Sequence, residues 1–183
     1  TNAGAEVGDL LFLTKPLGAG SITTGVKRDV ADQQHVDAAV AGMMRLNDTA
    51  ASAMKAADVK AATDITGFGL IGHAFNIARA SNVELRFSAS AIPLYGGALD
   101  LAKQGVISGA SSRGRDVYGP NATIHSDVPQ ELADICFDAE TSGGLLVCVH
   151  PGKVAAFGES LGAHDLFVQI GEVVSGSSRV SLV

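Results

Sequence analysis

The chain has 183 residues, 46% of them hydrophobic, with a formal net charge of −6 at pH 7 and a pI of about 5.2. This length is typical of one compact domain, and this apolar content is enough to build a core. Because the chain is acidic, has no Lys/Arg run and has no apolar run near the ~20 residues of a membrane span, we expect neither nucleic acid nor membrane as a partner.

Apolar periodicity and Pro/Gly punctuation divide the chain into alternating short strands and helices. Asn47 is expected to be the N-cap of an Ala-rich helix. In chain order we expect a strand over residues 9–14, helices over 33–45 and 48–57, a strand over 59–65, a helix over 69–80, a strand over 83–87, helices over 92–105 and 130–137, a strand over 145–150, a helix over 151–162, and strands over 167–174 and 179–183.

Residues 106–129 are rich in Gly, Ser and Pro and are expected to form a long irregular connection. The alternation lacks a strict βα rhythm, which favours an α+β fold: a layered sandwich of a mixed β-sheet with covering helices. Residues 1–8 are expected to be a linker or the remnant of a domain junction, and residues 9–183 the α+β domain. The start, TNAGAEVGD, lacks Met and looks cut.

Two cysteines, Cys136 and Cys148, argue by number and spacing against a disulfide framework and against a cysteine-rich zinc site. A reduced, cytoplasmic compartment fits best. Cys148 lies in the apolar run LLVCVH and is expected to pack inside a buried strand.

Asp64 stands between two threonines, after an expected strand and before a Gly-rich turn into a helix. Anions bind readily where backbone N–H groups converge at such a junction, and a carboxylate there would repel phosphate unless a cation lay between them. Since Mg²⁺ prefers carboxylate and phosphate oxygens together, one hypothesis makes Asp64 a metal ligand on a polyphosphate. The alternative is that Asp64 N-caps the helix. For His73, inside that helix, packing or a backbone bond is favoured over metal ligation.

Two other segments contain candidate ligand contacts. In ETSGGLL (140–146), two hydroxyl donors precede two glycines that would let the backbone approach a ligand, and the alternative is an ordinary turn before a strand. In TKPLGAG (14–20), Lys15 is either a phosphate contact or a solvated surface charge. No phosphate loop, pair of catalytic carboxylates or Ser/His/Asp order is visible, so we assign no catalytic residue.

Three segments in order, LTKPLGAG, TDITGFGLIGHA and DAETSGGLLV, resemble the C-terminal half of selenophosphate synthetase (selenide, water dikinase). LNDTAASAM and the pair Pro120-Asn121 also resemble that family, and the resemblance extends from about Gly8 to Val183. It implies the fold of the C-terminal domain of the aminoimidazole ribonucleotide synthetase-like superfamily.

The resemblance implies an enzyme of selenium metabolism, and so of selenocysteine biosynthesis, that makes selenophosphate from selenide, ATP and water and releases AMP and phosphate. It implies Mg²⁺ and a homodimer whose N-terminal domain supplies a catalytic Cys or selenocysteine, a Lys and most metal carboxylates. By motif, Asp64 matches the one C-terminal carboxylate that ligates the metals on the ATP phosphates. Residues near the nucleotide or its phosphates would be Lys15, Thr63, Gly67, Gly69, Thr141, Ser142, Gly143 and Gly144.

This chain has no glycine-rich Cys–Lys loop and no second carboxylate cluster. We therefore expect an isolated C-terminal domain, monomeric and inactive by itself, that lacks its N-terminal domain. The competing hypothesis is a ligand-binding or regulatory module, or a related ATP-dependent enzyme, on the same scaffold. The upstream sequence of the gene would discriminate, because only the first hypothesis requires a Cys- or Sec-containing loop there.

Overall fold

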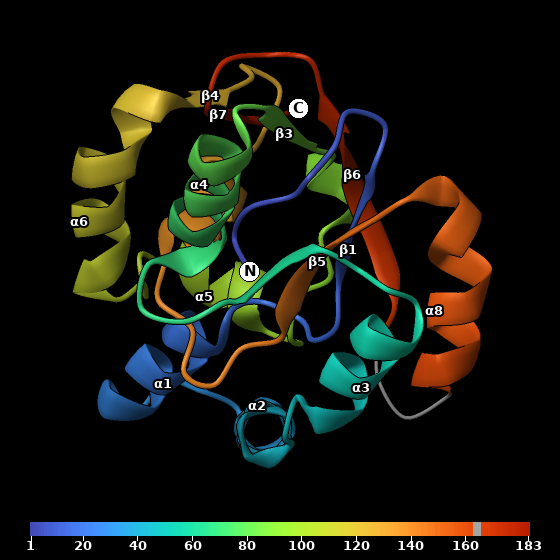
Figure 1. The fold of residues 1–183 in the computed structure, drawn as a ribbon. Helices are drawn as coiled ribbons and strands as arrows, with labels where there is room; N and C mark the ends of the chain where they lie inside the picture. Colours follow the sequence, from blue (N-terminus) through green and yellow to red (C-terminus); the bar gives the residue numbers. More distant parts are fainter. Residues whose placement is uncertain (163–165) are drawn as a thin grey trace.

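The computed structural model describes residues 1–162 and 166–183, which contain a seven-stranded mixed sheet with helices on both faces (Figure 1). The sheet order is β2-β5-β1-β6-β3-β7-β4, in which β3 and β4 run parallel to β7 and the other neighbours are antiparallel. This confirms the α+β fold. The strands are β1 (Leu10–Leu13), β2 (Ala61–Asp64), β3 (Glu84–Phe87), β4 (Ala122–Ile124), β5 (Leu145–Val149), β6 (Val168–Val174) and β7 (Arg179–Leu182).

The helices form two unequal layers. Figure 1 shows α3 and α8 side by side on one face of the sheet and α4 on the other, where α7 contacts both α4 and α5. Short 3₁₀ turns lie at residues 89–91, 119–121 and 151–153. The helices are α1 (Ala19–Lys27), α2 (Gln33–Met44), α3 (Asp48–Ala56), α4 (Gly69–Ser81), α5 (Ala98–Lys103), α6 (Gly109–Tyr118), α7 (Gln130–Phe137) and α8 (Val154–Leu161).

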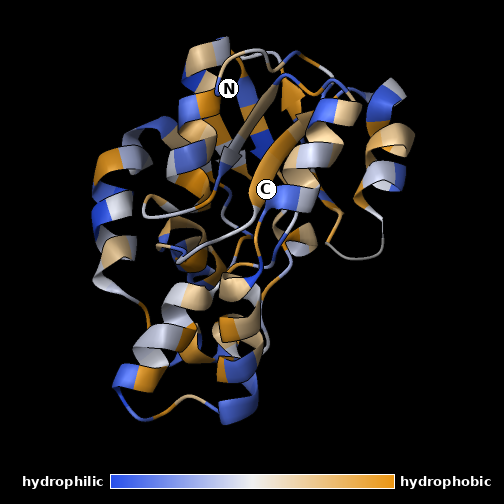
Figure 2. Ribbon diagram, turned by 60° about the horizontal axis from the view of Figure 1, so that its bottom comes forward, coloured by the Kyte–Doolittle hydropathy of each residue, from blue (hydrophilic) through white to orange (hydrophobic). Residues whose placement is uncertain are grey.

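The central strands contribute to two cores because side chains alternate across a strand. Leu11 and Leu13 of β1 belong to the larger core, which α4 and α7 cover, whereas Phe12 belongs to the smaller core under α3 and α8. Figure 2 shows largely hydrophobic strands beside helices of mixed hydropathy, as expected for amphipathic helices on a buried sheet. β1 and β5 are largely buried on both faces, and β2 is the edge strand beside β5.

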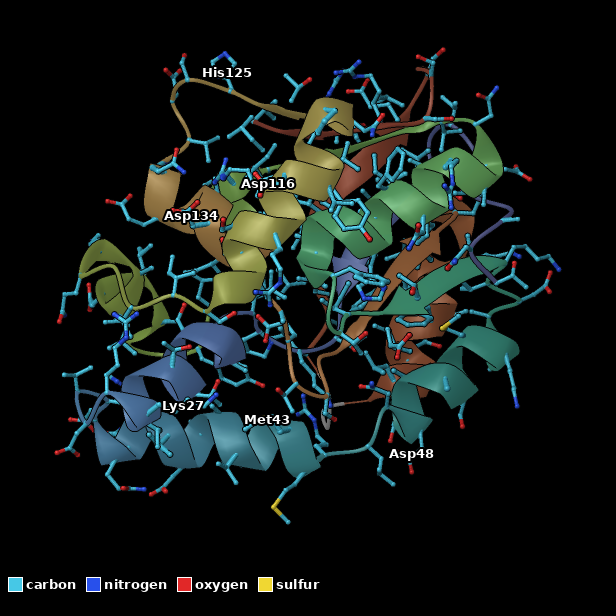
Figure 3. All side chains as sticks on the ribbon, turned by 90° about the vertical axis from the view of Figure 1, so that its left-hand side faces the viewer. Lys27, Met43, Asp48, Asp116, His125 and Asp134 are labelled. Atoms are coloured by element: carbon cyan, nitrogen blue, oxygen red, sulfur yellow. The ribbon has the colours of Figure 1, made fainter. Side chains whose placement is uncertain are left out.

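The prediction of an irregular connection over residues 106–129 was wrong, because α6 and β4 lie within it. The helix depends on tertiary contacts with α7 rather than on helix propensity. Ser108 caps α6 through its Oγ, which accepts a hydrogen bond from the Ala110 N–H, and Ser111 Oγ donates to the Asp134 carbonyl. Arg115 pairs with the Asp134 carboxylate and lies over the Phe137 ring. Asp116 and Asp134 mark this helix pair in Figure 3.

Two helices, α5 and α1, also differ from the elements expected from the sequence. Only residues 98–103 of the expected helix over 92–105 are helical, because Gly97 adopts a φ of +77° and packs against His35. Helix α1 was not expected from GAGSITTGVK. It begins at Ala19, where the Glu140 carboxylate accepts hydrogen bonds from the N–H groups of Gly18 and Ala19.

Both cysteines lie in the core, and burial raises the pKa of each thiol to about 12. This confirms the packing assignment of Cys148. Residues 1–8 lie against the domain, since the Thr1 carbonyl accepts a hydrogen bond from Ala62 N–H and Gly8 N–H donates to the Val173 carbonyl. Among the described residues, no helix has the length and hydropathy needed to cross a bilayer.

Candidate functional site

Asp64 is the last residue of β2, and its side chain is exposed at the edge of the sheet. Register pairs it with Leu145 of β5, so its backbone position is fixed by the sheet. Helix α4 begins only at Gly69, with Phe68 at the N-cap position and no side-chain cap. The alternative in which Asp64 caps this helix is therefore wrong, and within residues 1–162 and 166–183 its carboxylate has no hydrogen-bond or ion-pair partner.

His73 lies behind Asp64 on the buried side of α4, between two threonines. Its Nε2 is 3.0 Å from Thr66 Oγ1 and its Nδ1 is 3.5 Å from Thr63 Oγ1. Burial lowers the pKa of the imidazole, and the Asp64 carboxylate opposes that shift only in part. The favoured packing role of His73 is confirmed. The Thr63 hydroxyl also donates to the Asp64 carbonyl, so it braces the strand end.

The loop over residues 140–144 lies beside the segment that follows Asp64. Ile65 N–H donates to the Gly144 carbonyl over 2.9 Å, and Glu140 N–H donates to the Thr66 carbonyl over 3.0 Å. A Cβ on Gly143 would collide with the Ile65 carbonyl oxygen, and one on Gly144 would lie 2.5 Å from the Lys15 nitrogen. Both glycines are therefore needed for packing between segments. Thr141 and Ser142 are exposed, in the loop that leads into β5 where Leu145 pairs with Asp64.

Lys15 is buried, with 1% of its surface exposed, so the solvated-surface alternative was wrong. Its Nζ donates to the Arg45 carbonyl over 2.6 Å and to the Ser142 carbonyl over 3.0 Å. Asn47, expected as a helix cap, makes no side-chain cap bond, and its Nδ2 donates instead to the Gly143 carbonyl over 2.9 Å. The segment between α2 and α3 is thus joined to the loop.

The two expected glycines of the TGFG turn have different environments. Gly69 adopts a φ of +65°, and a Cβ there would lie 2.5 Å from the Asp138 carbonyl oxygen, so it is required for contact with the end of α7. A Cβ on Gly67 would meet nothing within 4 Å. Beside Gly67, the half-exposed Phe68 ring borders a pocket of about 230 Å³ with Tyr118 and Arg113. Of these two glycines, Gly67 is the one beside open space that a ligand could occupy.

Two carboxylates that the sequence analysis did not select organise this region from inside. Asp138 accepts hydrogen bonds from Ser108 and from Ala139 N–H, and burial raises the pKa of its carboxyl. Glu140 accepts from Gly18 N–H (2.6 Å) and Ala19 N–H (3.1 Å) at the start of α1. Burial raises the pKa of Glu140 to about 8, although the two N–H donors act in the opposite direction and lower it. The triplet DAE (138–140), directly before TSGG, was the feature of the sequence that could have indicated these two carboxylates.

The fold should lose stability as pH rises towards about 8, because Glu140 must ionise in a buried place. A folded-state pKa raised from 4.5 to about 8 contributes stability that is complete below pH 4.5 and is lost between those values. We expect the urea midpoint to fall from pH 5 to pH 8, and Glu140→Gln to reduce that slope. The exposed Glu159→Gln is the matched control and should keep the slope. An unchanged slope in Glu140→Gln would contradict the assignment.

A metal ion would find only one of its ligands here. Among the described residues, no group of three or more His, Cys, Asp or Glu side chains is placed to hold a metal. The exposed Asp64 carboxylate is a hard oxygen donor of the kind that Mg²⁺ takes, so the site fits one ligand position and not a complete coordination shell. The described residues therefore provide one part of a metal site.

A family model described as "AIR synthase related protein, C-terminal domain" matches residues 6–183. The chain is 39% identical over 185 residues to the selenide, water dikinase of Paraburkholderia xenovorans (strain LB400), covering 100% of this chain and 52% of that protein. It is 42% identical over 152 residues to the selenide, water dikinase of Caldanaerobacter subterraneus subsp. tengcongensis, covering 83% and 44%. The chain thus spans about half the length of the curated relatives it matches, and the resemblance to this family is confirmed.

Solved structures share the fold at low identity. Thiamine monophosphate kinase from Aquifex aeolicus matches with a TM-score of 0.62 and 17% identity, covering 99% of this chain and 52% of that one. The hydrogenase maturation protein HypE in complex with ATP matches with a TM-score of 0.59 and 15% identity, covering 100% and 49%. These likenesses confirm the expected architecture.

Proposed function

We propose that this chain, which belongs to the family of C-terminal domains of AIR synthase related proteins, acts within a selenide, water dikinase. There it would form one wall of an ATP–Mg²⁺ site. The observation that carries this proposal is the convergence of the three motifs. Asp64, the loop over 140–144 and Lys15 are distant in sequence but lie together at the end of the sheet where β1 and β2 end and β5 begins. Relatives of that name match over the whole chain.

The roles of this chain's residues follow from their placement. Asp64 would provide one carboxylate to Mg²⁺, and the other ligands would come from the N-terminal domain and the nucleotide phosphates. When bound, Mg²⁺ neutralises phosphate charge and orients the reacting groups. The pairing of β2 with β5 fixes the position of Asp64, and the exposed Thr141 and Ser142 hydroxyls are available to phosphate oxygens beside it.

The whole protein would convert selenide, ATP and water to selenophosphate, AMP and phosphate. Under this proposal the reacting selenium is handled by the N-terminal domain, which also makes the homodimer, and the protein is cytoplasmic. This chain by itself would be a monomer. It would lack the catalytic Cys or selenocysteine, since both of its own cysteines are buried in the core.

The isolated chain is expected to form no AMP from ATP in the presence of selenide and Mg²⁺, because it supplies one metal carboxylate and no accessible thiol. The same assay on the full-length protein should give AMP and orthophosphate only when selenide is added. Chromatographic separation of nucleotides measures both. Selenide-dependent AMP from the isolated chain would contradict the division of roles, and its absence in an intact, folded full-length protein would overturn the proposed function.

A further inference from the structure

We propose that Lys15 is a positioning residue for the loop that bears Thr141 and Ser142, acting from inside the fold and not as a ligand of the nucleotide. This inference rests on the proposed function of that site. It identifies what keeps the hydroxyl-bearing loop at a fixed place relative to Asp64.

Lys15 is anchored at the end of a central strand. It follows β1 after Thr14, and β1 is a central strand paired on both sides. Thr14 N–H donates to the Leu145 carbonyl over 3.2 Å, and Thr14 Oγ1 accepts from the Leu145 N–H over 2.8 Å. Thr14 therefore holds the base of the loop, and the side chain of the next residue, Lys15, reaches its tip at Ser142.

The loop contains a residue in an unfavourable backbone conformation. Ser142 adopts a φ of +55°, a left-handed conformation that is unfavourable for a residue with a Cβ. The Lys15 Nζ and the Asn47 Nδ2 bind the two successive carbonyls of Ser142 and Gly143 from the buried side. An ammonium donor makes a stronger hydrogen bond than a neutral donor, so Lys15 is the principal restraint on Ser142.

The loop is bonded to the segment that directly follows Asp64. With its carbonyls directed inwards, the loop exposes the Thr141 and Ser142 side chains, and its two ends are bonded to Ile65 and Thr66, directly after Asp64. Lys15 is 1% exposed and its Nζ faces two backbone carbonyls, which is unsuited to direct phosphate contact. Losing the ammonium would let the loop move relative to the carboxylate without removing any ligand contact.

The test compares Lys15→Met, which keeps the length of the side chain and removes the donor, with Lys55→Met at an exposed position on α3. In the full-length protein, amide hydrogen exchange of residues 141–144 should accelerate about tenfold or more in Lys15→Met, with β3 and β7 unchanged. The kcat for ATP turnover should fall about 10- to 100-fold, as expected for misplaced groups, while KM for ATP changes less than about threefold. Lys55→Met should behave as wild type.

Asn47→Ala provides a second variant in case Lys15→Met folds poorly, because the Asn47 side chain makes no cap bond to α3 and donates to the Gly143 carbonyl. It should accelerate exchange in the same amides by a smaller factor. Unchanged exchange in both variants overturns the proposal, and so does a large rise in KM with unchanged exchange, which would make Lys15 a ligand. If the wild-type protein shows no selenide-dependent turnover, the proposed function fails, while the exchange result still decides the role of Lys15.

Discussion

Replacing Asp64 with Asn in the full-length protein is expected to lower ATP turnover by two to three powers of ten and to leave the melting temperature almost unchanged. The loss in rate corresponds to roughly 2.7–4 kcal/mol of transition-state stabilisation. Asn keeps the size of the side chain and a neutral oxygen, but a hard cation loses an anionic donor. Because the carboxylate is exposed and has no partner among the described residues, the fold loses little when it is neutralised.

Turnover and melting temperature should be measured on the same preparation over a range of Mg²⁺ concentrations. Added Mg²⁺ should recover part of the binding but not the rate. Asp116→Asn is the matched control, since Asp116 is an exposed carboxylate on α6, apart from the motif segments (Figure 3). Wild-type turnover in Asp64→Asn would mean that the carboxylate at this strand end has no role in the reaction, because its capping role is already excluded by the start of α4.

Periodicity predicted the elements whose stability comes from an apolar stripe. The expected helix over 69–80 and the strand over 145–150 appear as α4 and β5 within a residue or so, because each buries a face that its own sequence marks. Helix α6 has no such stripe. It forms because Ser108, Ser111 and Arg115 bond to α7 and the residue after it, and these partners are 19 to 30 positions away, where no local pattern displays them.

The same limit applies to the candidate site. Asp64 could be selected from sequence because it is the lone charge at a strand-to-helix junction, and the structure leaves it exposed there. The burial of Lys15 could not be predicted, because it depends on carbonyls of residues 45 and 142 that come together only in the folded chain. Glu140 was overlooked for a similar reason, since its partners are amides at the start of α1, 121 and 122 residues earlier.

Gly69→Ala and Gly67→Ala should have opposite effects on the fold, although the sequence analysis gave both glycines the same role. Ala at 69 must adopt a φ of +65° with its Cβ 2.5 Å from the Asp138 carbonyl and 2.8 Å from the Phe137 carbonyl carbon, both backbone atoms that cannot rotate away. Left-handed strain and overpacking together should cost about 3 kcal/mol or more. In a chain of this size that lowers the melting temperature by about 6–12 °C.

Ala at 67 meets no atom within 4 Å and needs no left-handed backbone, so it should stabilise the fold by up to about 1 kcal/mol through the unfolded chain. Thermal unfolding of the two variants beside wild type measures both effects. In the full-length protein, Gly67→Ala should nevertheless raise KM for ATP, because a methyl group would enter the open space at Gly67, where the nucleotide is proposed to lie. A stable Gly67→Ala protein with wild-type KM would remove Gly67 from the site, and a Gly69→Ala protein as stable as wild type would show that the turn can shift away from α7.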